Sequence, residues 1–177
     1  NQARIISGDA KGRIGYVTGK HGGIDHVMVY FDEETLDLMT CEDKVHIKAC
    51  GQGLKLLDHE EIHVMNIDPS LLEKLNIKEH EDSIEIGVTT IVPAHLMGSG
   101  LGSATTMLGD YDIMTQDKKA NETYHINDLR FGDIVAVLDH DNHHGPHYLE
   151  GAITIGVVVH SDSFTSGPVS YTHLTLP

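Results

Sequence analysis

The sequence predicts a mainly β protein of the α+β class, with a small barrel over residues 1–52 and a larger β domain over residues 53–167 that is truncated at its C-terminus. In the first block, short runs rich in β-branched and aromatic residues alternate with glycine-rich breaks, as in a small sheet with tight turns. After residue 83 the apolar runs become longer, as expected for strands that are buried on both faces. Only one segment carries strong signals for a helix.

The first block contains four predicted strands and one helical turn. The strands are "ARIIS", "RIGYVTG", "IDHVMVYF" and "KVHIKACG", and the helical turn is "DEETLDLM". "GDAKGRIGYV" followed by "VMV", over residues 8–29, resembles the KOW element of SH3-like barrels, and its glycines suit turns at positive φ. Many such barrels contact RNA, but the basic residues here are few (Lys11, Arg13 and Lys20), so a scaffold role is expected.

The second block begins with the predicted helix, "DPSLLEKLNI", placed near residues 69–76. Asp68 is a suitable N-cap, and Pro69 suits the first helical position. Shorter strands are predicted in "GLKLL", "IHVMNI" and "SIEIGVTTIV", and two long strands in "INDLRFGDIVAVLDHD" and "GAITIGVVVHSD".

Composition limits the partners that the protein can bind and the cellular compartment in which it is expected. The net charge of −15 argues against binding to a phosphate backbone, which requires a basic face. No apolar run is long enough to span a membrane. The two cysteines form no CxxC motif, which favours a reducing, cytoplasmic location. The 14 histidines outnumber the 12 lysines and arginines, so the net charge is expected to change strongly near pH 6.

A histidine-rich loop, "LDHDNHHGPHY", is the densest polar cluster. Two carboxylates at a strand end, two residues apart, are expected to face the same way. With the following histidines they supply the ligand types that Zn²⁺, Mn²⁺ or Fe²⁺ bind, although the spacing matches no strong motif. The sequence therefore leaves open a site for a divalent metal such as zinc, or an exposed loop without an ion. The candidate ligands are Asp139, Asp141, His143, His144 and His147.

Two further segments carry weaker signals. "VVVHSDS" places His160 and Asp162 on one face at the end of a strand, where they are candidates for a catalytic base and its orienting carboxylate. "GSGLGS" contains Gly98, Gly100 and Gly102, whose backbone could bind an anion. A turn with no ligand is the alternative in both cases.

Seven stretches together resemble one prokaryotic family, the domain of unknown function 4438. They are "SGDAKGRIGYVTGKHGGIDHV", "GQGLKLL", "NIDPSLLEKLNI", "VPAHLMGSGLG", "GDYDI", "LRFGDIVAVLDHD" and "GAITIGVVVHSDS". The resemblance runs from about residue 4 to residue 167. It implies a cytoplasmic, mainly β protein of bacteria or archaea with an SH3-like part, and it implies no activity.

The last residues have a different origin in this interpretation. "VSYTHLTLP", residues 169–177, agrees in every residue with the translation of a transposase sequencing adapter. Pro168 is then encoded by a hybrid codon that spans the junction between the gene and the adapter. Residues 168–177 are therefore predicted to be a non-native tail on a metagenomic fragment. The tail is expected to be disordered or to pack without specificity.

Two functions remain open at this point. The first is a non-catalytic β module, monomeric or homo-oligomeric, that binds a small molecule or a protein. The second is a metal-assisted hydrolase or related enzyme that uses the His- and Asp-rich strand ends. If residues 133–141 and 151–162 form an antiparallel hairpin in which paired residue numbers sum to about 292, His160 lies about 30 Å from the start of its strand. Such a hairpin would argue against a single site.

Overall fold

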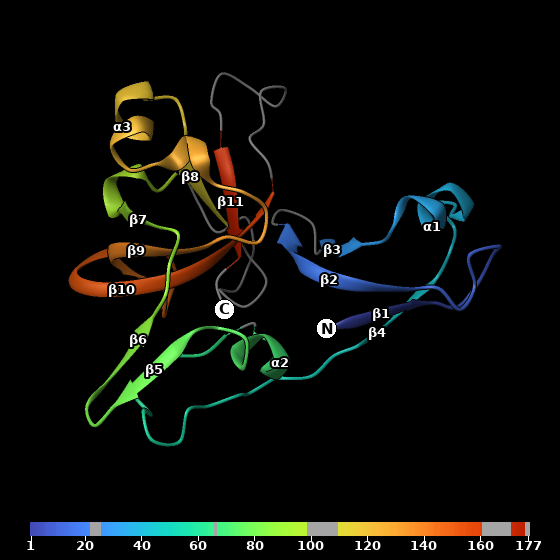
Figure 1. Cartoon of the computed structure of the whole chain (residues 1–177), viewed down its shortest axis with the longest axis horizontal. Coiled ribbons are helices and arrows are strands. Elements are labelled where there is room, and N and C mark those ends of the chain that lie inside the picture. Colours follow the sequence, from blue (N-terminus) through green and yellow to red (C-terminus); the bar gives the residue numbers. More distant parts are fainter. Residues whose placement is uncertain (22–25, 66, 99–109, 161–170, 176–177) are drawn as a thin grey trace.

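A computed structural model describes residues 1–21, 26–65, 67–98, 110–160 and 171–175 of the chain (Figure 1). For residue 21 and residues 171–175, only the backbone pairing is described. Strands dominate the described part and form a four-stranded, a five-stranded and a two-stranded sheet. The predicted mainly β class is confirmed.

The N-terminal sheet has the strand order β3-β2-β1-β4, and its neighbouring strands are antiparallel. Its strands are β1 (Gln2–Ile5), β2 (Ile14–His21), β3 (His26–Tyr30) and β4 (Val45–Lys48). Along β1 buried and exposed residues alternate, so Ala3 and Ile5 join Ala10 and Phe31 in a small core. All four predicted strands are present. Within the described residues, however, the sheet is open: β3 and β4 lie at its two edges and are not paired, so the predicted barrel closure is not seen.

Two helices begin where the sequence predicts. Helix α1 (Glu33–Leu38) is capped by Asp32, whose carboxylate accepts a hydrogen bond from the Thr35 backbone N–H at 2.8 Å. Helix α2 (Pro69–Leu72) has the predicted cap, Asp68, and the predicted proline. It is shorter than the predicted segment, which continues after Leu72 as turns.

The region between the two larger sheets departs most from the prediction. No described residue of "GLKLL" or "IHVMNI" belongs to a strand, although the second segment contains two buried residues, Met65 and Ile67. Their apolar side chains pack without backbone pairing to a sheet. "SIEIGVTTIV" is divided between β6 (Ser83–Ile86), which pairs with β5 (Ile77–His80), and β7 (Thr90–Pro93), which belongs to the five-stranded sheet.

The five-stranded sheet has the order β7-β9-β10-β11-β8. Most of its core comes from β7 and from three further strands, β8 (Tyr111–Met114), β9 (Ile134–Asp141) and β10 (His147–His160). Helix α3 (Lys118–Thr123) and two short 3₁₀ turns, η1 (Ala94–Leu96) and η2 (Ile126–Asp128), pack beside it. The buried cluster is aliphatic: Val92, Leu96, Ile113, Ile126, Val135, Val137 and Val158.

Strands β9 and β10 form the predicted antiparallel hairpin. Paired numbers sum to 291 from Ile153↔Leu138 to Val157↔Ile134, one less than predicted, and to 288 at His147↔Asp141 and Tyr148↔His140. The change in register marks a bulge, in which residues 149–152 of β10 lie opposite Asp139 alone.

Strand β11 (Tyr171–Thr175) lies in the segment that the sequence predicts to be a non-native tail. It pairs antiparallel with β10 on one side and with β8 on the other. Backbone pairing of this kind is open to any extended segment. The origin of the tail therefore stays a prediction.

Candidate functional site

The candidate site is the end of the β9–β10 hairpin, which carries most of the residues predicted to bind metal. The His147 Nε2 atom lies 3.1 Å from an Asp141 carboxylate oxygen, and its Nδ1 atom lies 3.0 Å from the Gly145 carbonyl oxygen. Both partners only accept hydrogen bonds, so each ring nitrogen of His147 faces an acceptor. The same Asp141 oxygen accepts a bond from the His143 backbone N–H at 3.3 Å.

Asp139 has a structural role in the bulge. It adopts a left-handed conformation (φ 54°), which is uncommon for a residue other than glycine. Its carboxylate accepts a hydrogen bond of 2.8 Å from the backbone N–H of Gly151, which the bulge removes from the regular ladder. Because of this kink, Asp139 and Asp141 line different cavities, and the prediction that they face the same way is wrong.

His147 contacts the Asp141 carboxylate, but His143 and His144 contact other histidine rings instead of converging on the same point. The His143 ring lies 4.6 Å from that of His63 and 4.7 Å from that of His144, measured between centroids. Among the described residues, no group of three or more His, Cys, Asp or Glu side chains is arranged to hold a metal ion.

His140, between the two aspartates, is buried and held in one tautomer. The Thr154 hydroxyl donates to the His140 carbonyl oxygen at 2.8 Å, so its oxygen acts as the acceptor for the His140 Nδ1–H at 3.1 Å. The Nε2 atom then carries a lone pair, and it is buried without a hydrogen-bond partner. Burial lowers the pKa of His140 and so favours this neutral form, although the Asp141 carboxylate acts in the opposite direction.

Tyr111 packs edge-on against His140, with 5.6 Å between ring centroids. Its hydroxyl is also buried without a partner. Burial, together with the negative charge of Asp141, raises the pKa of Tyr111 to about 12. The two side chains form a neutral, buried contact at the hairpin end.

Two cavities flank this hairpin end. The first, here called the His140 cavity, has a volume of about 490 Å³ and brings His95 and Gly98 beside Asp139, His140 and His147. Gly98 belongs to the predicted anion-binding loop, but its backbone N–H donates to the Asp112 carbonyl oxygen at 2.6 Å and is not available to an anion. Gly100 and Gly102 lie outside the described residues.

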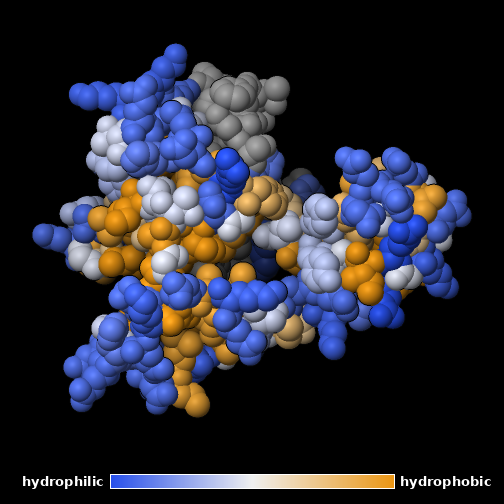
Figure 2. Space-filling view, in the orientation of Figure 1, coloured by the Kyte–Doolittle hydropathy of each residue, from blue (hydrophilic) through white to orange (hydrophobic). Residues whose placement is uncertain are grey.

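The second, here called the aliphatic cavity, has a volume of about 300 Å³. It lies between β10 and the segment that carries α2 and the β5–β6 hairpin, and Figure 2 shows hydrophobic residues gathered over this part of the molecule. Facing walls come from Leu72, Leu75, Ile77, Ile84, Ile86, Ile153 and Ile155. Its polar lining consists of Glu61, His63, Asp141, Asn142, His143 and Thr154.

The predicted catalytic pair is not brought to the hairpin end. His160 is the last residue of β10, thirteen residues after His147, and Asp162 lies outside the described residues. A strand of that length separates its ends by about 40 Å. The antiparallel pairing of β9 with β10 therefore keeps His160 away from the histidine loop.

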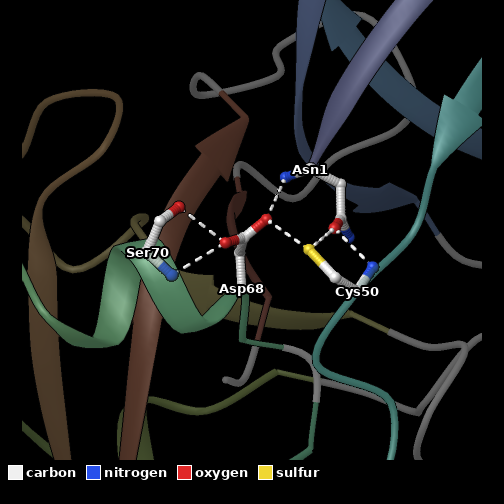
Figure 3. A network of polar contacts seen from close by, with 4 residues as sticks. All are labelled: Asn1, Cys50, Asp68 and Ser70. Atoms are coloured by element: carbon white, nitrogen blue, oxygen red, sulfur yellow. Dashed lines mark hydrogen bonds and ion pairs between the residues drawn. The ribbon is translucent and has the colours of Figure 1, made fainter.

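A separate polar network joins the N-terminal sheet to α2 (Figure 3). An Asp68 carboxylate oxygen lies 3.0 Å from the α-ammonium group of Asn1 and 3.3 Å from the Cys50 thiol, while the other oxygen accepts bonds from Ser70. These contacts, led by the Ser70 hydroxyl, hold the pKa of Asp68 well below its usual range. Asp68 in turn raises the pKa of Cys50, which makes this thiol a poor nucleophile.

Sequence reasoning missed the aliphatic cavity and several residues beside it. Glu61 and His63 lie in an irregular segment far from the hairpin in sequence, and their approach to the hairpin end depends on long-range packing, whereas Asn142 belongs to the hairpin turn itself. One signal was available: "IHVMNI" is a mainly apolar segment that carries His63 among apolar residues.

Comparison with known proteins places the chain in a family. Among curated proteins no relative matches it. A solved structure, titled "Crystal structure of TM1086", is 49% identical, with a TM-score of 0.88. The match covers 99% of this chain and 62% of that one, so this chain spans less than two thirds of its relative. None of the described helices is long and apolar enough to cross a membrane. Models for the N-terminal and C-terminal parts of one family match residues 1–73 and 74–172, so the chain belongs to the family described as domain of unknown function DUF4438.

Proposed function

We propose that this protein is a binding module for a small molecule with an apolar part, and that the ligand occupies the aliphatic cavity. One observation carries the proposal: aliphatic walls from three separate elements enclose a cavity to which the hairpin end adds polar groups. Ligand sites of soluble proteins commonly combine an apolar lining with a few polar groups that orient the ligand. The volume, about 300 Å³, lies at the small end of the usual range.

The chemistry of the hairpin end supports binding better than catalysis. His140 is locked between Thr154 and Tyr111, and its free nitrogen is buried. A general base must reach the proton that it removes. We also propose a reducing, cytoplasmic location, which the two free cysteines support.

The test is a titration of methyl-labelled isoleucines with 1-hexanol, followed by NMR. Saturable shifts are expected for Ile77, Ile84, Ile86 and Ile155, which line the cavity, and not for Ile5, which belongs to the N-terminal core. Ile86→Phe, which fills the cavity, should weaken binding strongly. Ile91→Phe is the matched control, because Ile91 is half exposed on β7 and does not line the cavity. Equal binding by both variants would refute the proposal.

The alternative function, a metal-assisted hydrolase, has its own test. If the histidine loop binds metal in the full-length natural protein, replacing His143, His144 and His147 together should remove stoichiometric metal. Elemental analysis of purified wild type and variant measures this directly. An unchanged metal content would exclude the loop as the source of ligands.

A further inference from the structure

We infer that the ligand of the aliphatic cavity is a primary alkylammonium ion, with its chain between the isoleucines and its charged group at the hairpin end; this inference rests on the proposed function. The first argument is charge. Glu61 and Asp141 both line the cavity, and no lysine or arginine is among its described lining residues. With neutral histidines, the polar lining is therefore formally anionic, and the whole chain carries a net charge of −15. An anionic head group would be repelled in this position.

The second argument is the hydrogen-bonding capacity of the polar lining. Carboxylates only accept hydrogen bonds, and a neutral imidazole and a side-chain amide each offer an acceptor as well. His63, Asn142 and His143 add such acceptors beside the two carboxylates. An ammonium group has three donors and no acceptor, so its requirements match what this surface offers.

The third argument is the position of each carboxylate. Asp141 is partly buried, with 28% of its side chain exposed, and it is held by His147 and by the His143 backbone N–H. Glu61 has 69% of its side chain exposed, and its carboxylate lies 3.6 Å from the His59 Nδ1 atom. Asp141 is thus a carboxylate held in one position, which can accept a further donor besides His147, whereas Glu61, beside His59, lies mostly in solvent and can turn toward a cation that enters.

The fourth argument is the shape of the apolar part. The inner face of the β5–β6 hairpin presents Ile77, Ile84 and Ile86, because Ile77 pairs with Ile86 and strand residues alternate between faces. Ile153 and Ile155 of β10 lie across the cavity from them. The described lining residues include no Phe, Tyr or Trp, so the apolar walls suit a flexible aliphatic chain.

The experiment compares three probes of equal length: hexylammonium, 1-hexanol and hexanoate. They are titrated into the protein at pH 7 and followed through the isoleucine methyl signals. Hexylammonium is expected to bind about tenfold more tightly than hexanol, the usual gain from a hydrogen bond to a charged group, and hexanoate more weakly than both. Glu61→Gln should reduce hexylammonium affinity severalfold and leave hexanol affinity unchanged. Glu60→Gln, an exposed neighbour that does not line the cavity, controls for the change in net charge.

The outcomes separate this inference from the proposed function. If hexanol binds as tightly as hexylammonium, or hexanoate binds most tightly, the ammonium inference is wrong and the cavity remains a binding site. If no probe produces saturable shifts, both are wrong. If Glu60→Gln weakens hexylammonium binding as much as Glu61→Gln does, the effect is one of overall charge, and the inference is again overturned.

Discussion

The Thr154 hydroxyl donates to the carbonyl oxygen of His140 and accepts from the Nδ1 atom of the same residue, so one side chain of β10 fixes both the backbone and the ring of its neighbour on β9. Both residues are buried, with 7% and 3% of their surfaces exposed, and water cannot replace either bond.

Thr154→Val should therefore lower the free energy of unfolding by about 1–3 kcal/mol, because two buried polar atoms lose their partner. Thr154→Ser keeps the hydroxyl and removes one methyl group, which costs about 1 kcal/mol. Urea denaturation measures both, and ¹⁵N shifts of the His140 ring report its tautomer. A valine variant as stable as the wild type would contradict the role of the hydroxyl.

Tyr111→Phe should leave stability unchanged or raise it at pH 7, because it removes a buried hydroxyl that has no hydrogen-bond partner. The variant should also resist alkali better. The folded-state pKa of about 12 lies above the ordinary value of 10, so the unfolded chain loses its proton first and stability falls as the pH rises above about 10. Thermal melts between pH 8 and pH 11 test this. A clear loss of stability at pH 7 would reveal a partner for the hydroxyl.

Asp68→Asn should destabilise the chain at pH 7 by at least about 1 kcal/mol, since asparagine can still cap α2 but has one acceptor oxygen where the carboxylate uses two, one toward Ser70 and one toward Cys50. The pKa of Asp68 is lowered in the folded state, so its contribution is present above the unfolded value of about 3.9 and is lost as the pH falls below it. The difference from wild type should shrink on acidification from pH 5 to pH 3. Glu73→Gln, at an exposed site after α2, should show no such trend.

Gly15→Ala should destabilise the N-terminal sheet by about 1–3 kcal/mol, because a Cβ atom there would collide with the Tyr30 carbonyl oxygen and lie 2.6 Å from the Phe31 ring. Gly87→Ala is the matched control, because its nearest neighbour, Asn76 Cβ, is 4.0 Å away. Chemical denaturation of both variants provides the comparison. Equal stability would mean that β2 and β3 are not packed as described.

The sequence by itself determined the local elements, because their causes are local. Asp32 and Asp68 have side chains that cap a helix start, and Pro69 is already shaped for a first turn. The β-branched runs became strands β9 and β10, and their pairing followed from adjacency in the chain. The register was predicted to within one residue over most of the hairpin. Family membership was also readable from the order of the motifs.

Only the tertiary structure decided how the polar residues at the hairpin end are used. The left-handed Asp139 and the bulge opposite it separate two carboxylates that strand periodicity would place together. His63 meets His143 across eighty residues of sequence, and Ile86 faces the same cavity as Ile155. Such contacts between distant segments depend on long-range packing. The free energy of this packing is a sum over many weak contacts, and the residues that make them follow no periodic pattern in the sequence. The sequence therefore determined the starts of helices α1 and α2 and the strands of the N-terminal sheet and of the β9–β10 hairpin, and tertiary packing decided which side chains share a cavity.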